Sequence, residues 1–259
     1  MEKEFNTGLV LSGGGARGFA HLGVIQALNE AGIYPDIISG TSAGAIAGSL
    51  YADGYDPTEI FRLMNTKSAL DYFSLAVPRG GLLKISGVIR ILENSLRATT
   101  FEKLKIPLIT AATDLNNGKV VYFSSGDLLN AVIASSSIPV LFRPIVINGI
   151  QYVDGGVLDN LPVRPLEKRC RFIIGSFVNP SGYEENITSL MHIAVRTFLL
   201  SVSKEVVEKS AKFDMLIAPP ELKNYKILDP EKAQEMFDIG YKATVEKLKE
   251  VDISSVVSR

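Results

Sequence analysis

The chain has 259 residues, of which 46% are hydrophobic and 21% charged, a composition that can bury a sizeable core and excludes a mainly disordered protein. Its 27 basic and 28 acidic residues give a formal net charge of -1, so no global field attracts nucleic acid, and any contact with a membrane surface must be local. No segment reaches the roughly 18 apolar residues of a membrane-spanning helix, and the single cysteine, Cys170, cannot form an intrachain disulfide, so we expect a cytoplasmic protein.

The first fifty residues predict a parallel βαβα unit. Thr7–Ser12 is a short apolar run followed by glycines, which indicates a buried strand and its turn. Apolar residues then recur at helical spacing from Phe19 to Gly32. Asp36–Ser39 indicates a second buried strand, and Ala45–Tyr51 indicates a helix rich in small residues. This alternation of strand and helix is typical of a parallel sheet.

Residues 57–97 are predicted to be mostly helical, with breaks at Pro78, Gly80 and Gly81. This segment is the best candidate for a cap over a functional site. Its apolar side chains fit either a lipid-facing surface or an ordinary buried core. They include Tyr72, Phe73, Leu75, Val77, Leu82 and Leu83.

Two hairpins follow, each with an Asn-Gly turn that tolerates positive φ. The first pairs Pro107–Thr113 with Lys119–Ser124, and the second pairs Ile145–Ile147 with Gln151–Val153. The remaining predicted elements are a strand at Arg171–Val178, a helix from Ile187 to about Phe213, a strand at Asp214–Ala218 and a helix at Pro230–Glu250. We therefore predict a single three-layer α/β domain over residues 1–259, with a mainly parallel mixed sheet flanked by helices.

Ser42 is the candidate nucleophile, because Gly40-Thr41-Ser42-Ala43-Gly44 follows a predicted strand and precedes a predicted helix. This is the G-x-S-x-G pattern of a nucleophile elbow, whose sharp turn crowds the positions two residues on either side of the serine. Free N–H groups at the helix N-terminus would favour a developing negative charge. The alternative interpretation is a serine that caps a helix in a glycine-rich turn.

The loop Gly13–Gly18 joins the first strand to its helix and offers consecutive N–H groups suited to an oxyanion hole. The same residues satisfy the dinucleotide fingerprint G-x-G-x-x-G, which requires an acidic residue at the end of the second strand. Asp36 lies at about the right distance from the glycines in sequence, but it begins the second strand and does not end it. This position disfavours a dinucleotide site. A phosphate-binding NTPase loop is disfavoured as well, because no Lys-Ser or Lys-Thr follows the glycines.

The chain has only two histidines, and neither resembles the late-loop base of a serine hydrolase. His21 lies on the first helix and His192 on a late helix, where structural roles are expected. Asp154, which precedes Gly155 and Gly156 at the end of a predicted strand, is the best candidate for a carboxylate base. An ordinary Asp-Gly turn is the competing interpretation.

Three motifs in this order resemble the patatin-like phospholipase family, namely the Gly13–Gly18 loop, the Gly40–Gly44 elbow and Asp154-Gly155-Gly156. Further stretches look like those of small bacterial members related to neuropathy-target-esterase domains. They are Ala111–Leu115, Ser135–Pro139 and Asn160–Pro162, so that the likeness covers about residues 6 to 180.

The resemblance implies a patatin-like fold and a catalytic dyad of Ser42 and Asp154. It implies that the oxyanion glycines are Gly13, Gly14 and Gly15. Arg17 would either steer an anionic head group or steady the loop by hydrogen bonds. The glycines expected to support the site are Gly18, Gly40, Gly44, Gly155 and Gly156.

The implied function is a serine acyl hydrolase that cleaves fatty-acyl esters of lysophospholipids, phospholipids or related lipids through an acyl-enzyme. No metal and no organic cofactor is expected, and the expected partner is a lipid or acyl-ester substrate, with a peripheral membrane contact left open. An acyltransferase that uses the same nucleophile is one alternative. A non-catalytic dinucleotide-binding or regulatory protein that keeps the loop is the other. The oligomeric state is left open.

Overall fold

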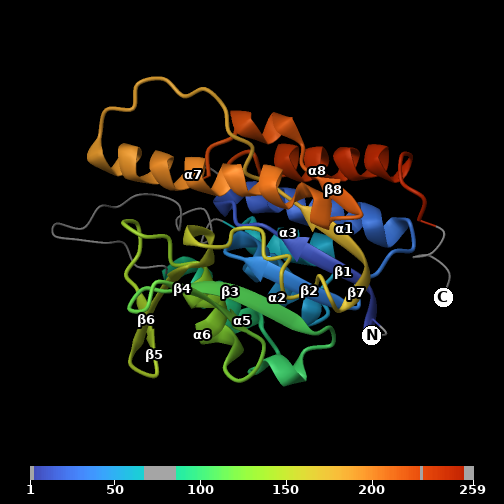
Figure 1. The fold of residues 1–259 in the computed structure, drawn as a ribbon, viewed down its shortest axis with the longest axis horizontal. Helices are drawn as coiled ribbons and strands as arrows, with labels where there is room; N and C mark the ends of the chain where they lie inside the picture. The colour runs from blue at the N-terminus through green and yellow to red at the C-terminus, as the bar shows by residue number, and fades with distance from the viewer. Residues whose placement is uncertain (1–2, 67–85, 228–229, 254–259) are drawn as a thin grey trace.

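The computed structural model describes residues 3–66, 86–227 and 230–253. Within them, eight strands form one mixed sheet in the order β5-β6-β3-β2-β1-β7-β8, with β4 paired to β3 (Figure 1). This confirms the predicted α/β domain with a mainly parallel sheet. The middle of the predicted cap, including Pro78, Gly80, Gly81 and the six apolar residues named for it, lies outside the described residues.

The parallel part of the sheet has β1 at its centre. Its five strands are β1 (Phe5–Leu11), β2 (Ile37–Thr41), β3 (Leu108–Asp114), β7 (Cys170–Ser176) and β8 (Met215–Ile217). Both faces are covered, so β2 and β3 are buried throughout and β1 is buried from Thr7 onward, and all three carry runs of apolar residues. Leu9 and Leu11 pack into one core, and Val10 between them packs into the other.

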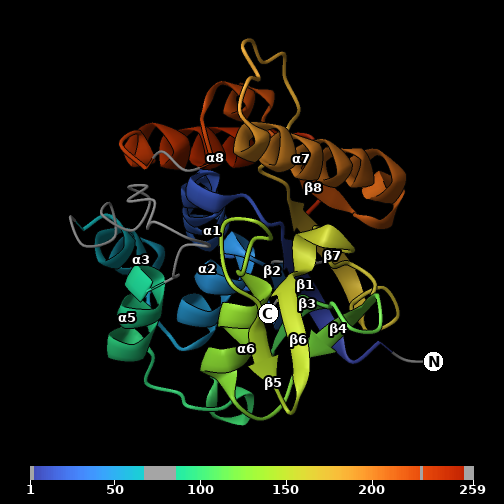
Figure 2. The ribbon, with the colours of Figure 1, turned by 90° about the vertical axis from the view of Figure 1, so that its left-hand side faces the viewer.

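Helices cover one face of this sheet (Figure 2). They include α1 (Phe19–Glu30), α2 (Ala43–Ala52), α6 (Leu128–Ser135) and α8 (Ala233–Leu248), with α3 (Pro57–Met64) and α5 (Ser86–Ser95) beside them. α3 begins where expected from its sequence, because Asp56 accepts a hydrogen bond from the Glu59 N–H at 2.8 Å and Pro57 needs no donor there. The opposite face packs against residues 161–170 and the late part of α7 (Leu190–Lys209).

Both predicted hairpins are confirmed. β4 (Lys119–Phe123) pairs with β3, and β5 (Ile145–Ile147) pairs with β6 (Ile150–Asp154), all antiparallel. The short helical turns are η1 (Gly15–Gly18), η2 (Phe101–Lys103), η3 (Gly155–Val157), η4 (Ser210–Lys212) and η5 (Pro220–Asn224). None of the described helices has both the length and the apolar content needed to cross a bilayer.

Helix α6 was not predicted from the sequence. It is only eight residues long, and six of them are buried, so it shows no amphipathic periodicity. Its one local signal is Asp127, whose side chain accepts a hydrogen bond from the Asn130 N–H at 2.9 Å as an N-cap. The omission matters because the last residue of α6, Ser135, lies under the candidate site.

Candidate active site

Ser42 and Asp154 are 112 positions apart in sequence, and β3 brings them together. The last residue of β2, Thr41, pairs with Ala111, and the last residue of β6, Asp154, pairs with Ala112. β4 occupies one edge of β3 along this stretch, so β2 and β6 share the other edge. The two strands run toward each other and end at adjacent positions, with Ser42 as the next residue after β2.

The backbone of Ser42 has φ 53° and ψ -119°, a region that non-glycine residues rarely adopt. α2 begins at the next residue, as expected for a nucleophile elbow. A Cβ added to Gly40 would lie 2.6 Å from the Gly44 carbonyl oxygen, and a Cβ on Gly44 would strike the Leu11 carbonyl oxygen. The two predicted elbow glycines therefore allow the close approach of strand and helix that the turn requires.

Ser135 fixes this elbow and was not assigned a role from the sequence. Its buried Oγ accepts a hydrogen bond from the Ser42 N–H at 3.0 Å and donates one to the Ala111 carbonyl at 2.6 Å. One hydroxyl thus satisfies two backbone groups at the junction of β2, β3 and α6. The strained turn is held by a contact that no local pattern encodes.

Asp154 is buried, with 1% of its surface exposed. Its Oδ1 accepts a hydrogen bond from the Gly156 N–H at 2.8 Å, and its Oδ2 has no well-formed hydrogen bond within the described residues. Burial raises the pKa of Asp154 to about 7, an effect that the nearby Ser42 hydroxyl and the Gly156 N–H partly oppose. One carboxylate oxygen of Asp154 is therefore available beside Ser42, and Asp154 changes its charge near neutral pH.

The predicted oxyanion loop does not offer all three glycines equally. The Gly13 N–H donates to the Asn160 carbonyl at 3.2 Å, whereas the N–H groups of Gly14 and Gly15 have no partner among the described residues. The Gly13 carbonyl accepts hydrogen bonds from Asn179 Nδ2 at 2.8 Å and from the Ser12 hydroxyl at 2.9 Å. A trans peptide points its N–H opposite to its carbonyl, so these two contacts orient the Gly14 N–H.

The remaining predicted residues lie around this centre. Arg17 is nearly buried, and its guanidinium donates from Nε to the Tyr225 carbonyl at 2.8 Å and from Nη1 to the Pro180 carbonyl at 3.5 Å. These bonds tie η1 to the late loops, as expected of a residue that steadies the glycine loop. The other supporting glycines leave no room for a side chain. A Cβ added at Gly18 would contact Ala43, one at Gly155 would contact the Ala111 carbonyl, and one at Gly156 would contact both Asp154 and Asn160.

Neither histidine contacts Ser42. His21 is fully buried, and its Nε2 donates to the Ser12 carbonyl at 2.8 Å while its Nδ1 accepts from the Ser176 hydroxyl at 2.8 Å. Burial lowers the pKa of His21 to about 4, so the ring is neutral at pH 7 and joins the ends of β1 and β7. His192 is on α7, where its Nε2 lies 2.8 Å from Glu184. Neither imidazole ring hydrogen-bonds to Ser42 or Asp154 within the described residues.

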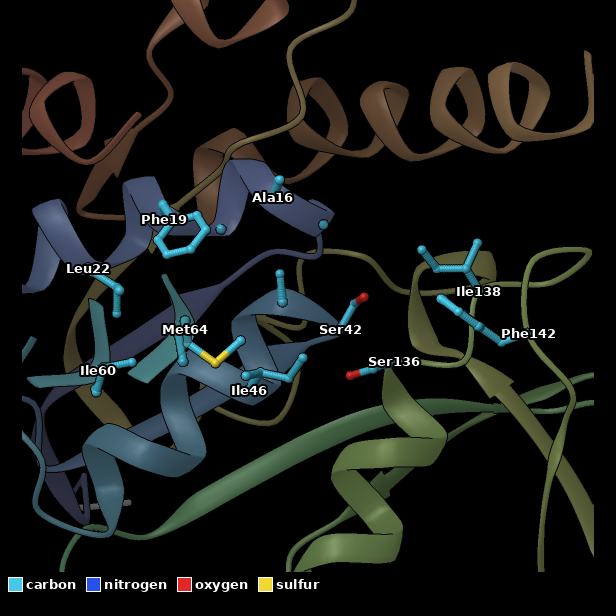
Figure 3. Close-up of a pocket in the computed structure, with 14 residues that line it drawn as sticks. Ala16, Phe19, Leu22, Ser42, Ile46, Ile60, Met64, Ser136, Ile138 and Phe142 are labelled. Carbon is cyan, nitrogen blue, oxygen red and sulfur yellow. The ribbon is translucent and has the colours of Figure 1, made fainter. Parts of the chain in front are cut away.

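An apolar pocket opens beside Ser42 (Figure 3). In the close-up, Ser42 lies between Ile46 and Met64 on one side and Ile138 and Phe142 on the other. The lining also includes side chains from α1 and α3 and has little polar surface. Such a pocket suits an alkyl chain and offers little to a sugar or a charged group.

The structure does not place Asp36 at the glycine loop, where a ribose would need an acidic residue. Asp36 lies at the amino end of β2, whereas the loop is at the carboxyl end of β1, and its Oδ2 accepts hydrogen bonds from the N–H groups of Asn6 and Thr7. Asp36 therefore stabilises the sheet, which argues against a dinucleotide site.

Within the described residues, no three His, Cys, Asp or Glu side chains are grouped as metal ligands.

Comparison with known proteins gives the following likenesses. A family model described as patatin-like phospholipase matches residues 9–167. Lysophospholipase NTE1 of Kluyveromyces lactis is 32% identical over an aligned length of 272 residues, and the alignment covers 90% of this chain and 18% of that protein. An uncharacterised NTE family protein of Mycobacterium bovis is 36% identical over 160 residues, which cover 61% of this chain and 44% of that protein. The chain thus spans less than half the length of these relatives.

A similar fold occurs in the crystal structure of VipD from Legionella pneumophila. The TM-score is 0.57, and the match covers 95% of this chain and 67% of that chain. The sequence identity is 18%, so this likeness concerns the fold alone.

Proposed function

The chain belongs to the patatin-like phospholipase family, and from that premise we propose that it hydrolyses fatty-acyl esters of lysophospholipids or related lipids. Ser42 is the proposed nucleophile and Asp154 its base. The observation that carries the proposal is the pair itself, a strained serine beside a buried carboxylate with one free oxygen, next to an apolar pocket. The name of the fungal relative, a lysophospholipase, supports the substrate class.

The proposed mechanism uses only groups of this site. Asp154 Oδ2 takes the hydroxyl proton as Ser42 Oγ forms a bond to the ester carbonyl carbon, and the N–H groups of Gly14 and Gly15 donate to the resulting oxyanion. Collapse of the tetrahedral intermediate breaks the bond to the alcohol oxygen, which receives the proton from Asp154. Water then attacks the acyl carbonyl carbon as the same carboxylate takes its proton, and Asp154 passes this proton to Ser42 Oγ as the bond to the fatty acid breaks.

An acyltransferase would share every step up to the acyl-enzyme. It would differ only in using an acceptor other than water. Release of free fatty acid without an added acceptor separates the two functions, and the hydrolase proposal requires it. A non-catalytic protein would form no acyl-enzyme at all.

The pH dependence of hydrolysis tests the base. Asp154 must be ionised to accept the proton, and burial raises its pKa to about 7, so kcat/KM should rise tenfold per pH unit below about pH 7 and level off above it. The measurement uses an uncharged p-nitrophenyl acyl ester between pH 5 and 9. Enzyme held at each pH and returned to pH 8 controls for inactivation. A flat profile over this range would rule out a base of this pKa.

Ser135→Ala tests whether the elbow must be fixed. The change leaves the Ser42 N–H and the Ala111 carbonyl without their partner, so we expect a loss of about 1–3 kcal/mol of stability and a kcat up to about 100-fold lower. KM should change little, because the pocket lining is intact. Stability is read from thermal unfolding, and kcat is measured well below the melting temperature.

The matched control is Ser137→Ala, whose hydroxyl donates only to the Ile133 carbonyl at 2.8 Å. It removes a buried hydroxyl from the same turn without touching the elbow, and its kcat should stay within about twofold of the original. If Ser135→Ala lowers stability but keeps full kcat, Ser135 supports the fold and does not position Ser42.

A further inference from the structure

A second cavity, of about 540 Å³, adjoins the Ser42 site. Its walls come from η1, α7 and the loops that follow β7 and β8. Asn179, Leu199 and Ile227 line both this cavity and the small pocket around Ser42. That small pocket shares Ser42 and Ile138 with the apolar pocket. The apolar pocket, the small pocket around Ser42 and the second cavity therefore adjoin one another in that order, with Ser42 in the middle.

The second cavity is cationic, although the whole chain has a net charge of -1. Its charged lining within the described residues consists of Arg17, Arg196, Lys223, Lys226 and the carboxylate of Glu184. Glu184 is already engaged, at 3.3 Å from Arg196 and 2.8 Å from His192. Lys223 and Lys226 are exposed and have no ion pair within the described residues. Positive charge is thus concentrated in one hollow of a nearly neutral molecule.

The ester group of a lipid has an acyl chain on one side of its carbonyl carbon and an alcohol on the other. With the carbonyl at Ser42 and the acyl chain in the apolar pocket, the alcohol part lies toward the cationic cavity. We propose that this cavity binds the phosphate-bearing head group of the lipid substrate, an inference that rests on the proposed function. The cavity and its charges thereby select an anionic lysophospholipid over a neutral monoacylglycerol.

Arg17 contributes to this preference without being the contact itself. Its two hydrogen bonds go to neutral carbonyl groups, and the nearby Glu184 carboxylate, which favours the charged form of Arg17, is shared with Arg196 and His192. Burial lowers the pKa of Arg17 to about 10, which still leaves it fully charged at pH 7. It adds positive potential from the wall of the cavity, while the exposed lysines are free to reach a phosphate.

The test is a charge reversal of both lysines, Lys223→Glu with Lys226→Glu, assayed on two monomeric substrates with the same acyl chain. These are 1-octanoyl lysophosphatidate and 1-monooctanoylglycerol, whose solubility avoids effects of a lipid surface. We expect kcat/KM for the lysophosphatidate to fall by about tenfold or more, mainly through KM. The value for the monoacylglycerol should stay within about twofold, because no charge meets its glycerol.

Lys168→Glu is the matched control. This exposed lysine precedes β7, at the end of the sheet opposite to Ser42, so its reversal changes the net charge by half as much as the double variant and leaves the cavity unaltered. It should leave both substrates unaffected. An unchanged preference in the double variant, or an equal loss on both substrates, would overturn the head-group assignment.

Binding to the Ser42→Ala protein gives a result that does not depend on catalysis. By calorimetry, this variant should bind octanoyl lysophosphatidate at least about tenfold more tightly than monooctanoylglycerol, and the added lysine reversals should remove the difference. If the unaltered chain hydrolyses neither lipid but this binding preference holds, the hydrolase proposal fails and the cationic cavity stands. Equal binding of the two lipids refutes the cavity whatever the activity.

Discussion

Ser42→Ala is expected to abolish ester hydrolysis, with kcat lower by on the order of 10⁴-fold or more, while the protein stays folded. The change removes the attacking oxygen and little volume. It keeps the Ser42 N–H that donates to Ser135, so the elbow retains its anchor. Activity is measured as fatty-acid release, and folding by circular dichroism and thermal unfolding.

Two companion variants sharpen this result. Ser49→Ala removes a buried serine hydroxyl of α2, the helix that follows Ser42. This hydroxyl donates only to the Ile46 carbonyl, so the variant should keep full activity. Ser42→Gly should be as inactive as Ser42→Ala but more stable by about 1–3 kcal/mol, because glycine tolerates the positive φ at this position. A Ser42→Ala protein with substantial activity would refute Ser42 as the nucleophile.

Asp154→Asn is expected to lower kcat by about 10³-fold or more, because the amide cannot accept the Ser42 proton. The same change should stabilise the protein. Burial holds the folded pKa of Asp154 near 7, whereas the unfolded chain releases this proton near the ordinary value of 3.8. The folded state therefore binds the proton more tightly between about pH 4 and 7, and the unfolding free energy falls as the pH rises through that window.

Asparagine removes this penalty, so the variant should exceed the original in stability at pH 8 by up to about 4 kcal/mol, the upper bound set by a shift of about three pKa units. The advantage should shrink toward pH 5, where the native carboxyl is protonated. Chemical unfolding at both pH values measures it. An Asp154→Asn protein that is less stable at pH 8, with unchanged activity, would mean that Asp154 is a structural turn residue.

The elements that build the site were predictable because their signals are local. Apolar runs marked β1 and β2, the Asn-Gly turn marked the hairpin that ends at Asp154, and the spacing of Gly40 and Gly44 marked the elbow. The adjacency of β2 and β6 on β3 could not be predicted. It depends on strand pairing between residues far apart in sequence.

The positioning contacts were missed for the same reason. Ser135 reaches Ser42 across 93 residues, and Asn179 reaches the Gly13 carbonyl across 166. Nothing in the loop sequence distinguishes Gly13, whose N–H donates to Asn160, from Gly14 and Gly15, whose N–H groups have no partner among the described residues. Which glycines can serve as oxyanion donors is decided by tertiary hydrogen bonds and not by the motif.

The raised pKa of Asp154 is likewise a property of the folded chain. An isolated aspartate near pKa 3.9 would be a weak base at neutral pH. Burial between β6 and η3 changes this, and the neighbouring Gly156 N–H offsets only part of the effect. The scarcity of histidine could suggest a carboxylate base, but only the structure gives the physical reason why a carboxylate can serve.

A fluorophosphonate that carries an alkyl chain tests the central claim, a Ser42–Asp154 dyad without histidine, most directly. Peptide mass spectrometry should place the phosphonyl adduct on Ser42. The labelling rate should be unchanged in His192→Gln, since the His192 ring hydrogen-bonds to Glu184 and not to Ser42 or Asp154, and at least about 100-fold lower in Asp154→Asn. An adduct on another serine, or a labelling rate that depends on His192 and not on Asp154, would contradict the dyad.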